Sequence, residues 1–346
     1  MPRVPRIEFE NATYHVMARG NRSEPIVFSD QDRELFVKTL HDACLRSGWK
    51  VFAWVLMDDH YHFVLRTPNA NLVSGMQWFQ NAYTRRLNSR HRLSGPLFGG
   101  RYRSILVENE DRGGDVSQDY LKTAIDYVHL NPGRGGMVDG VETSLGDYRW
   151  SSIAQGYLLP PTKRPQWLVV DEVLDLYHYP DRTEGRRRFV KRLDEWIADE
   201  KGIPELDGIS FEARVKRGWF WGTGTFKERM LKLLSKKGKR KSRDYQSSPM
   251  ERSHTERRAN QIVKEGLKHY GQTLRELRGT RRGDWKRSSV AWAITRETTV
   301  PHAWISEKLN LSSAANASQQ VRRFAKVPDA ELPMKERKWK QSRNAG

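Results

Sequence analysis

Apolar and polar residues in the first 110 positions of the chain follow two periods, one typical of strands and one typical of helices. Residues 30–47 and 68–88 repeat apolar side chains every three or four positions, which predicts amphipathic helices. Four shorter runs are rich in β-branched and aromatic side chains, which predicts strands. These runs are residues 13–19, 51–57, 63–65 and 102–107.

The predicted order is therefore strand, helix, strand, strand, helix, strand. This is the split βαβ arrangement of ferredoxin-like folds, in which an antiparallel sheet carries two helices on one face. We expect an α+β domain over residues 1–150, with the second face of the sheet left for a functional site. A third amphipathic helix is expected at Ser117–Leu130, where Asn131-Pro132 ends the periodic pattern.

The remainder of the chain is predicted to be mostly helical. Its composition suggests a helical extension, a flexible basic linker, a compact α-helical DNA-binding domain and a disordered basic tail. Within the extension, helical spacing is clearest at Gln166–Leu176 and Arg186–Ile197. The four parts are, in order, residues 151–235, 236–254, 255–325 and 326–346.

The compact helical domain ends in the pattern of a helix-turn-helix motif. A helix at Trp304–Asn310 is followed by a second at Ala317–Ala325, for which Ser312 is the expected N-cap. The pair resembles the helical DNA-binding domain of the DnaA initiator. The alternative is a plain helical bundle with a basic surface. The polar residues expected on the recognition helix are Gln319, Gln320, Arg322 and Arg323.

Charge is distributed unevenly along the chain. The formal net charge of +19 favours a polyanionic partner. Residues 1–150 hold 19 Lys and Arg against 18 Asp and Glu, whereas residues 151–346 hold 42 against 24. We therefore expect a nearly neutral domain with a site, followed by a region that binds nucleic acid. A general surplus of charge for solubility is the alternative.

Composition also limits the compartment. No apolar run approaches the roughly 18 residues that span a bilayer, and Met1–Arg6 lack the apolar core of a signal peptide. We expect no membrane partner and a cytoplasmic, nucleoid-associated protein. Cys44 is the only cysteine in the sequence, which excludes an intramolecular disulfide and a zinc site built from several thiolates.

The stretch Ala53–Leu65 carries the most distinctive polar residues of the first half. Its apolar runs flank Asp58-Asp59-His60-Tyr61-His62, which predicts two buried strands joined by a tight turn at the acidic pair. Because side chains alternate along a strand, His60 and His62 should point the same way, roughly 7 Å apart. Two such imidazoles can bind one divalent metal ion. Alternatively, one is a turn residue and the other a half-buried polar group.

A second polar pair lies at the end of the helix predicted at Ser117–Leu130. Tyr127 and Asn131 are four residues apart and share one face of that helix. His129 points away from this line and is a weaker candidate. Taken alone, Tyr127 is an ordinary tyrosine of an amphipathic helix; the histidine pair upstream makes it a candidate site residue.

Five short segments occur in order over the first half, and together they resemble the HUH endonuclease superfamily. The resemblance is closest to the REP-associated single-tyrosine transposases, which are IS200-like. Each segment is weak individually, but their order makes the resemblance specific. Asp59 departs from the family pattern, where Asn precedes the first histidine; it adds charge near the metal but removes no ligand. The segments are Tyr14–Asn21, Met57–Phe63, Phe98–Ser104, Tyr127–Pro132 and Tyr148–Ser152.

The resemblance implies an activity and its residues. His60, His62 and Asn131 become ligands of Mg²⁺ or Mn²⁺, and Tyr127 becomes the nucleophile that leaves a 5′-phosphotyrosine and a free 3′-OH. The implied partners are single-stranded or hairpin DNA, including REP-like repeats, and duplex DNA, bound by a monomer or homodimer. The implied DNA-contacting residues are Arg19, Asn21, Arg101, Arg103, Gln319, Arg322 and Arg323.

Two other functions compete with this hypothesis. One is a catalytically idle, sequence-specific DNA-binding regulator whose first domain only holds hairpin DNA. The other is a metallohydrolase that uses the histidine pair and a water molecule, with a structural Tyr127. A covalent adduct between protein and DNA separates the three, because only the nicking enzyme forms one.

Overall fold

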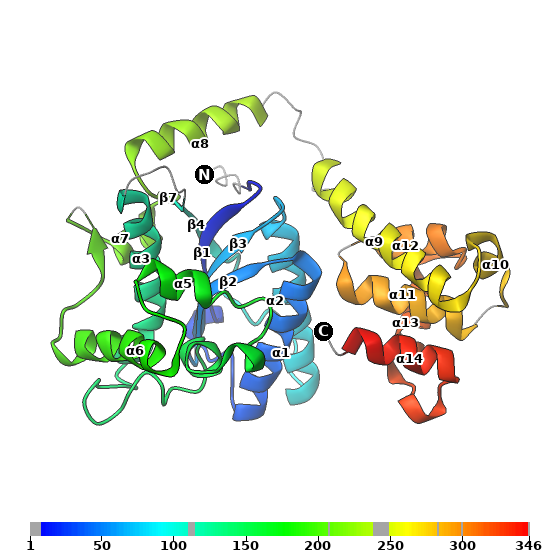
Figure 1. Cartoon of the computed structure of the whole chain (residues 1–346), viewed down its shortest axis with the longest axis horizontal. Helices are drawn as coiled ribbons and strands as arrows, with labels where there is room; N and C mark the ends of the chain where they lie inside the picture. Colours follow the sequence, from blue (N-terminus) through cyan, green and yellow to red (C-terminus); the bar gives the residue numbers. More distant parts are fainter. Residues whose placement is uncertain are drawn as a thin grey trace. The chain divides into compact units, whose positions relative to one another are not determined.

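The computed structural model describes residues 8–109, 115–206, 208–237, 249–281, 284–298 and 300–344. It contains two compact units with separate hydrophobic cores, one within residues 1–245 and one formed mainly by residues 246–346 (Figure 1). No described helix is both long enough and apolar enough to cross a membrane.

The basic linker expected at residues 236–254 lies outside the described residues from 238 to 248. Its described ends are helical: helix α8 (Gly224–Lys237) precedes the gap and α9 (Pro249–Tyr270) follows it. Pro249 is compatible with the start of α9 because the first turn of a helix does not need its N–H group.

The first unit is built on a five-stranded sheet with the order β2-β3-β1-β4-β7. Strands β2, β3, β1 and β4 pair antiparallel, and β7 joins β4 in parallel. Helix α1 (Asp30–Ser47) follows β1, and α2 (Leu72–His91) follows β3, so the expected order of strands and helices is confirmed. The strands are β1 (Ala12–Arg19), β2 (Lys50–Leu56), β3 (His60–Thr67), β4 (Arg103–Val107) and β7 (Phe220–Trp221).

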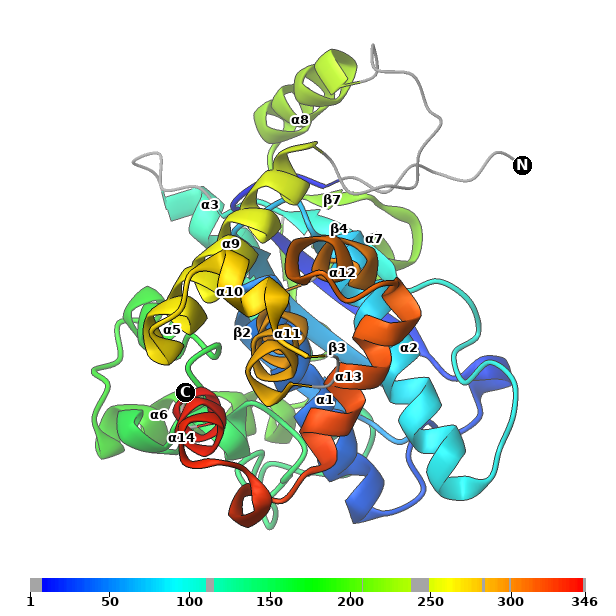
Figure 2. The ribbon, with the colours of Figure 1, turned by 90° about the vertical axis from the view of Figure 1, so that its right-hand side faces the viewer.

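Helices α1 and α2 cover one face of this sheet (Figure 1 and Figure 2). Phe36 of α1 contacts the rings of Tyr61 and Phe63 on β3, with centroids 5.3 and 6.2 Å away. Phe79 and Tyr83 of α2 complete the cluster at 5.2 and 5.0 Å from Phe36. These aromatic contacts fix which side of β3 faces the helices. Because side chains alternate along the strand, the neighbours of Tyr61 lie on the opposite face.

That opposite face is covered by segments that follow residue 110. Helix α3 (Asp115–His129) packs on β2 and β3, and the short helix α4 (Asn131–Arg134) continues from it. A ribbon of β5 (Glu205–Leu206) and β6 (Ile209–Ser210) leads into α7 (Phe211–Arg217), which packs against α3 and β4. The sheet is therefore a middle layer between α1 and α2 on one side and α3 and α7 on the other.

The segment expected as a helical extension at 151–235 is only partly helical. It contains α5 (Asp171–Leu176) and α6 (Thr183–Ala198). Residues 166–170, expected to be helical, instead run beside β2, because Val51 exchanges backbone hydrogen bonds with Trp167 and Val169 at 2.8 Å each. This segment and β7 both extend the sheet. The first unit therefore includes residues after position 150, where its boundary was expected.

The second unit is arranged around helix α11 (Trp285–Glu297), whose residues from Val290 to Ile294 are buried. Helix α11 packs against α9, α12, α13 and α14. Helix α10 begins with a capping box, in which Thr273 and Glu276 satisfy each other's backbone N–H groups. The remaining helices are α10 (Leu274–Gly279), α12 (His302–Leu309), α13 (Ala314–Lys326) and α14 (Met334–Asn344).

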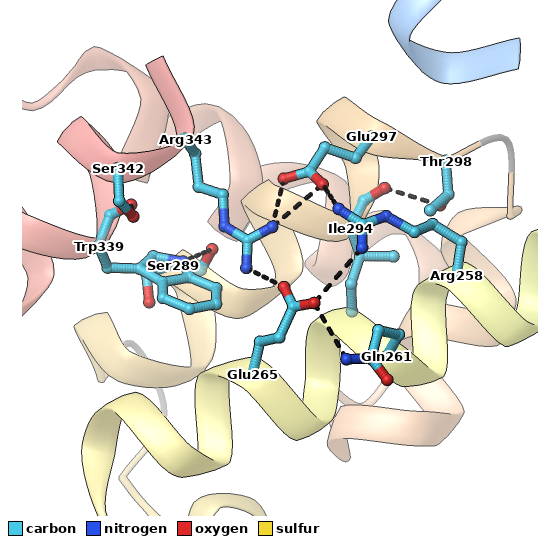
Figure 3. Close-up of polar contacts among 10 residues, drawn as sticks. All are labelled: Arg258, Gln261, Glu265, Ser289, Ile294, Glu297, Thr298, Trp339, Ser342 and Arg343. Atoms are coloured by element: carbon cyan, nitrogen blue, oxygen red, sulfur yellow. Dashed lines mark hydrogen bonds and ion pairs between the residues drawn. The ribbon is translucent and has the colours of Figure 1, made fainter. Parts of the chain in front are cut away.

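The prediction of a disordered basic tail at 326–346 is wrong, because α14 packs onto this unit. Trp339 is 3% exposed, and its indole Nε1 donates a hydrogen bond of 3.2 Å to the carbonyl of Ser289. Arg343 forms ion pairs with Glu265 of α9 and Glu297 of α11 (Figure 3). The many Lys and Arg residues of the segment suggested disorder, whereas Leu332 and Trp339 are buried in this unit, and an indole and a guanidinium supply polar anchors.

Candidate active site

The two histidines of β3 lie on the face of the sheet that α3 covers. Strand β3 begins at His60, directly after the turn at Asp58-Asp59, so neither histidine is in the turn itself. Their ring centroids are 5.1 Å apart and the ring planes are nearly perpendicular, at 86°. His62 is buried, whereas His60 is partly exposed at the start of the strand. Of the two rings, the His60 ring is therefore the one that solvent reaches.

Each histidine ring is oriented by a contact at its Nδ1 atom. His60 Nδ1 lies 2.5 Å from Oδ1 of Asp59, and His62 Nδ1 lies 2.9 Å from Nε2 of His15. These contacts leave Nε2 of both rings as the nitrogen that can bind a metal ion. Asp59, noted in the sequence as a departure from the family pattern, thus orients His60, and it also pairs with Arg19 at 3.4 Å.

His15 is a site residue that we did not single out in the sequence. The pairing of β1 with β3 places it opposite Val64, beside the pair formed by Met17 and His62. Burial lowers the pKa of His15 to about 3 and the pKa of His62 well below its ordinary value. Both imidazoles are therefore neutral near pH 7, which is the state in which an imidazole binds a metal.

Tyr127 and Asn131 reach the same place from the end of α3 and the start of α4. The Tyr127 ring lies edge-on to His62 and His15, with centroid distances of 5.5 and 5.8 Å. Asn131 donates its side-chain N–H groups to the carbonyls of Tyr127 and Val128, at 2.7 and 3.4 Å. The side-chain oxygen of Asn131 is therefore the atom available to a cation.

His129, the weaker candidate of α3, lies elsewhere. It is 1% exposed, and its Nε2 is 3.0 Å from Oγ of Ser152. Burial lowers its pKa to about 3. Its ring contacts the rings of Tyr157 and Phe189, so His129 is part of the packed core of the first unit.

A further part of the site comes from α7, far along the chain. The buried Phe211 ring lies 4.9 Å from that of Tyr127 and 5.1 Å from that of His15. On α4, the guanidinium carbon of Arg134 is 4.8 Å from the centre of the Tyr127 ring, and its Nη2 donates to Glu212 at 3.1 Å. Nothing in the spacing of Phe211 or Glu212 connects them with Tyr127, so sequence analysis missed both.

Tyr127, His60, His62 and Asn131 line one cavity of about 690 Å³. The backbone at the rim of this cavity requires a glycine at position 20, because a Cβ atom there would lie 1.9 Å from the carbonyl oxygen of Glu24. The four DNA-contacting residues expected in the first half all line the cavity as well. These residues are Arg19, Asn21, Arg101 and Arg103.

The donor set fits an open cation site. Two imidazoles and an amide oxygen suit a divalent ion such as Mn²⁺ or Mg²⁺ and leave positions for water or a phosphate oxygen. Within the described part of the chain, no three or more His, Cys, Asp or Glu side chains are grouped to hold a metal ion.

The candidate recognition helix of the second unit is α13. Gln319, Arg322 and Arg323 are exposed on it, and the Arg323 guanidinium lies 4.6 Å from the centre of the Trp285 ring. Its N-cap is Ser313, whose side chain accepts from the Asn316 N–H, and not Ser312, which is held in the turn with a φ of 63°.

Gln320, expected on the recognition face of α13, instead points into the second unit. Its side-chain oxygen accepts a hydrogen bond from Ser288 Oγ of α11 at 3.2 Å. Its side-chain nitrogen donates to Asn316 at 3.4 Å. Gln320 thus holds α13 against α11, and the exposed face of α13 is the one that carries Gln319 and Arg322.

Comparison with known proteins gives one family match. Residues 8–124 match the family model described as "Transposase IS200 like". The match includes His60 and His62, covers less than half of the chain and ends before Tyr127. No curated protein matches the chain.

A solved structure is also similar to part of the chain. It is described as "Structure of the REP associates tyrosine transposase bound to a REP hairpin", with 18% sequence identity and a TM-score of 0.34. The similarity covers 44% of this chain and 82% of that chain.

Proposed function

We propose that the protein is a transposase of the single-tyrosine HUH type, which nicks and rejoins single-stranded DNA. One observation carries the proposal: Tyr127, the two histidines of β3 and Asn131 line one cavity together with several arginines. The match of residues 8–124 to IS200-like transposases supports it. On this proposal, the sheet with α1 and α2 is a ferredoxin-like HUH core.

Tyr127 is the nucleophile in this proposal. The phenol loses its proton and its oxygen bonds to the phosphorus of a backbone phosphate while the bond from that phosphorus to the 3′ oxygen breaks. The 3′ oxygen takes up a proton and leaves as a hydroxyl, so no net proton is consumed. The DNA stays attached as a 5′-phosphotyrosine, so a 3′-OH can later reverse the step without ATP. Phe211 and Arg134 contact the Tyr127 ring and restrict its orientation before attack.

His60, His62 and Asn131 would hold Mg²⁺ or Mn²⁺, which when bound supplies Lewis-acid stabilisation of negative charge on the phosphate. The contribution of the chain is orientation. Asp59 and His15 hold the two rings through their Nδ1 atoms, which presents Nε2 of each ring. Arginines of the cavity supply charge that complements the DNA backbone.

We propose a separate role for the second unit, the binding of duplex DNA through a helix-turn-helix formed by α12 and α13. The exposed Arg322 and Arg323 supply phosphate or base contacts, and Gln319 is a candidate for base contact. The partners are then single-stranded or hairpin DNA, including REP-like repeats, for the first unit and duplex DNA for the second.

Denaturing electrophoresis tests the proposed reaction. The full-length protein is incubated with Mn²⁺ and single-stranded DNA labelled on one or the other side of the nick. We expect the fragment that carries the 5′ phosphate to migrate with the protein, and the other fragment to be released with a 3′-OH. Tyr127→Phe should abolish the adduct, whereas Tyr120→Phe on the same helix should retain it.

An adduct that survives in Tyr127→Phe would refute the assignment of the nucleophile. DNA binding without any adduct would favour the catalytically idle regulator. Release of both fragments without attachment to the protein would favour the metallohydrolase.

A further inference from the structure

The cavity around Tyr127 has a pronounced imbalance of charge. Among the described residues that line it, Glu212 is the only carboxylate. A cavity that accepts a DNA backbone gains from its cations and loses from any fixed anion. A carboxylate at this position would weaken DNA binding, so its contacts within the cavity are informative. The six cationic residues that line the cavity are Arg19, Arg22, Arg101, Arg103, Arg134 and Lys216.

Glu212 contacts two of these cations. Its Oε2 accepts from Arg134 Nη2 at 3.1 Å, and its Oε1 lies 2.7 Å from Lys216 Nζ. The hydrogen bond from Lys216, together with the charges of Lys216 and Arg134, lowers the pKa of Glu212 below its ordinary value. Glu212 is therefore an anion at neutral pH, with each carboxylate oxygen on a different cation.

The position of Arg134 connects this anion to the reacting group. The same guanidinium that pairs with Glu212 lies 4.8 Å from the centre of the Tyr127 ring. Any oxyanion bound between Arg134 and Lys216 is thus next to the tyrosine. Guanidinium groups bind carboxylates and phosphates with similar geometry, so one anion can replace the other.

We propose that Arg134 and Lys216 form a phosphate-binding subsite for the backbone of single-stranded DNA, and that Glu212 occupies this subsite until DNA displaces it. The identity of the DNA rests on the proposed function; the subsite rests on the contacts of Glu212. Exchange is feasible because the Glu212 side chain is 25% exposed, and ion pairs with that much solvent contribute little to stability.

Neutralising Glu212 is the direct test. The affinity of the full-length protein for a fluorescent single-stranded oligonucleotide is measured from low to moderate salt. Glu212→Gln should bind about threefold to tenfold more tightly at low salt, because the phosphate no longer competes with a carboxylate. The salt dependence should steepen by about 0.7 in the logarithmic slope, the value for one additional phosphate neutralised on a single strand.

A matched substitution controls for the change in net charge. Glu195 on α6 also forms an ion pair with a lysine four positions away, Lys191, and does not line the cavity. Glu195→Gln should therefore leave both affinity and salt slope unchanged. In the double variant Glu212→Gln with Arg134→Gln, the gain should disappear, because one of the two cations that bind the phosphate is missing.

The proposal is overturned if Glu212→Gln binds no more tightly than the unmodified protein, or gains no more than Glu195→Gln. It also fails if Glu212→Gln and Glu212→Ala both lower the melting temperature so far that no folded protein remains, because the carboxylate is then structural. The adduct assay is independent of these outcomes. A gain in affinity without any Tyr127 adduct would keep the subsite and reject the nicking function.

Discussion

The two units of the chain present their positive charge in different ways. The first, residues 1–245, has 40 Lys and Arg against 32 Asp and Glu, and the second, residues 246–346, has 21 against 10. In the first unit, arginines line a concave cavity near His15 and His62, which are buried and neutral. In the second, Arg322 and Arg323 are exposed on one helix. A reacting group needs fixed orientation, whereas a contact to duplex phosphates needs exposure.

Net charge therefore points to the proposed nucleic-acid-binding surface of the second unit but not to the proposed reaction site of the first. The first unit has the smaller charge density, yet its cations converge on one cavity. Its site also depends on uncharged groups, such as the His15 and His62 pair, that no charge count can find. If the two units differ in this way, changes in one should leave the function of the other intact.

Removal of a histidine from β3 should have the largest effect and should be confined to the first unit. His60→Ala or His62→Ala should reduce cleavage of single-stranded DNA by about 100-fold or more, because a ligand position is removed. Affinity for duplex DNA should stay within about twofold, since most phosphate contacts are expected elsewhere. Gel assays of cleavage and fluorescence anisotropy of binding measure the two quantities.

The exposed His178 of the same unit supplies the control, and His178→Ala should cleave normally. Undiminished cleavage by the unmodified protein in excess chelator would contradict the metal requirement. An equal loss of duplex affinity in His60→Ala would contradict the separation of the units.

Removal of the partner of His62 should have an intermediate effect. In His15→Leu, the Nδ1 atom of His62 no longer has a polar partner on β1, so Mn²⁺ affinity should fall by about 10-fold to 100-fold, as is typical when a group that orients a ligand is removed. Electron paramagnetic resonance of free Mn²⁺ measures this affinity directly. His15→Gln, whose side-chain amide can contact Nδ1 of His62, should recover part of the lost Mn²⁺ affinity.

Thermal unfolding shows whether these variants remain folded. If folded His15→Leu binds Mn²⁺ as well as the unmodified protein, His15 does not position a ligand. If the unmodified protein binds no Mn²⁺, the site itself is wrong.

Substitution of the α13 arginines should affect only the second unit. Arg322→Gln with Arg323→Gln should weaken duplex binding by about 10-fold and should flatten the salt dependence by about 0.9 for each phosphate that is no longer neutralised. Cleavage of single-stranded DNA at saturating concentration should not change. Arg275→Gln on the exposed side of α10 serves as the matched control. Unchanged duplex affinity and slope in the double variant would reject α13 as the recognition helix.

The smallest effect is expected at the end of the chain. Arg343→Gln should lower the free energy of unfolding of the second unit by about 1–2 kcal/mol, because the pairs with Glu265 and Glu297 are partly shielded from solvent. Urea unfolding measures the change, with the exposed Lys338→Gln on the same helix as control. Equal stability of the two variants would mean that α14 does not need this anchor.

Periodic patterns predicted the parts of the fold that local sequence determines. The alternation in β1 and β3 and the helical spacing in α1, α2 and α3 each reflect one buried face, so elements and their order followed directly. His60 with His62, and Tyr127 with Asn131, were found because each pair lies within a single stretch of chain.

Residues that join the site through tertiary structure could not be found in this way. His15 requires the register of β1 against β3, and Phe211 and Glu212 require the packing of α7 on α3. Composition also misled at the C-terminus, where abundant charge outweighed the few apolar residues that are buried there, among them Leu332 and Trp339. The N-cap of α13 is Ser313 and not the expected Ser312, because two adjacent serines offer the same side chain and only the backbone of the turn decides which one reaches the Asn316 N–H.

The central claim is that Tyr127 forms the covalent bond to DNA, and mass spectrometry of the adduct tests it most directly. The full-length protein is reacted with a short single-stranded oligonucleotide and Mn²⁺, the DNA is trimmed by nuclease, and the protein is digested with trypsin. The account predicts one modified peptide, spanning Thr123–Arg134, with the phosphonucleotide on Tyr127. A phosphonucleotide on any other residue, or none despite cleavage of the DNA, would contradict it.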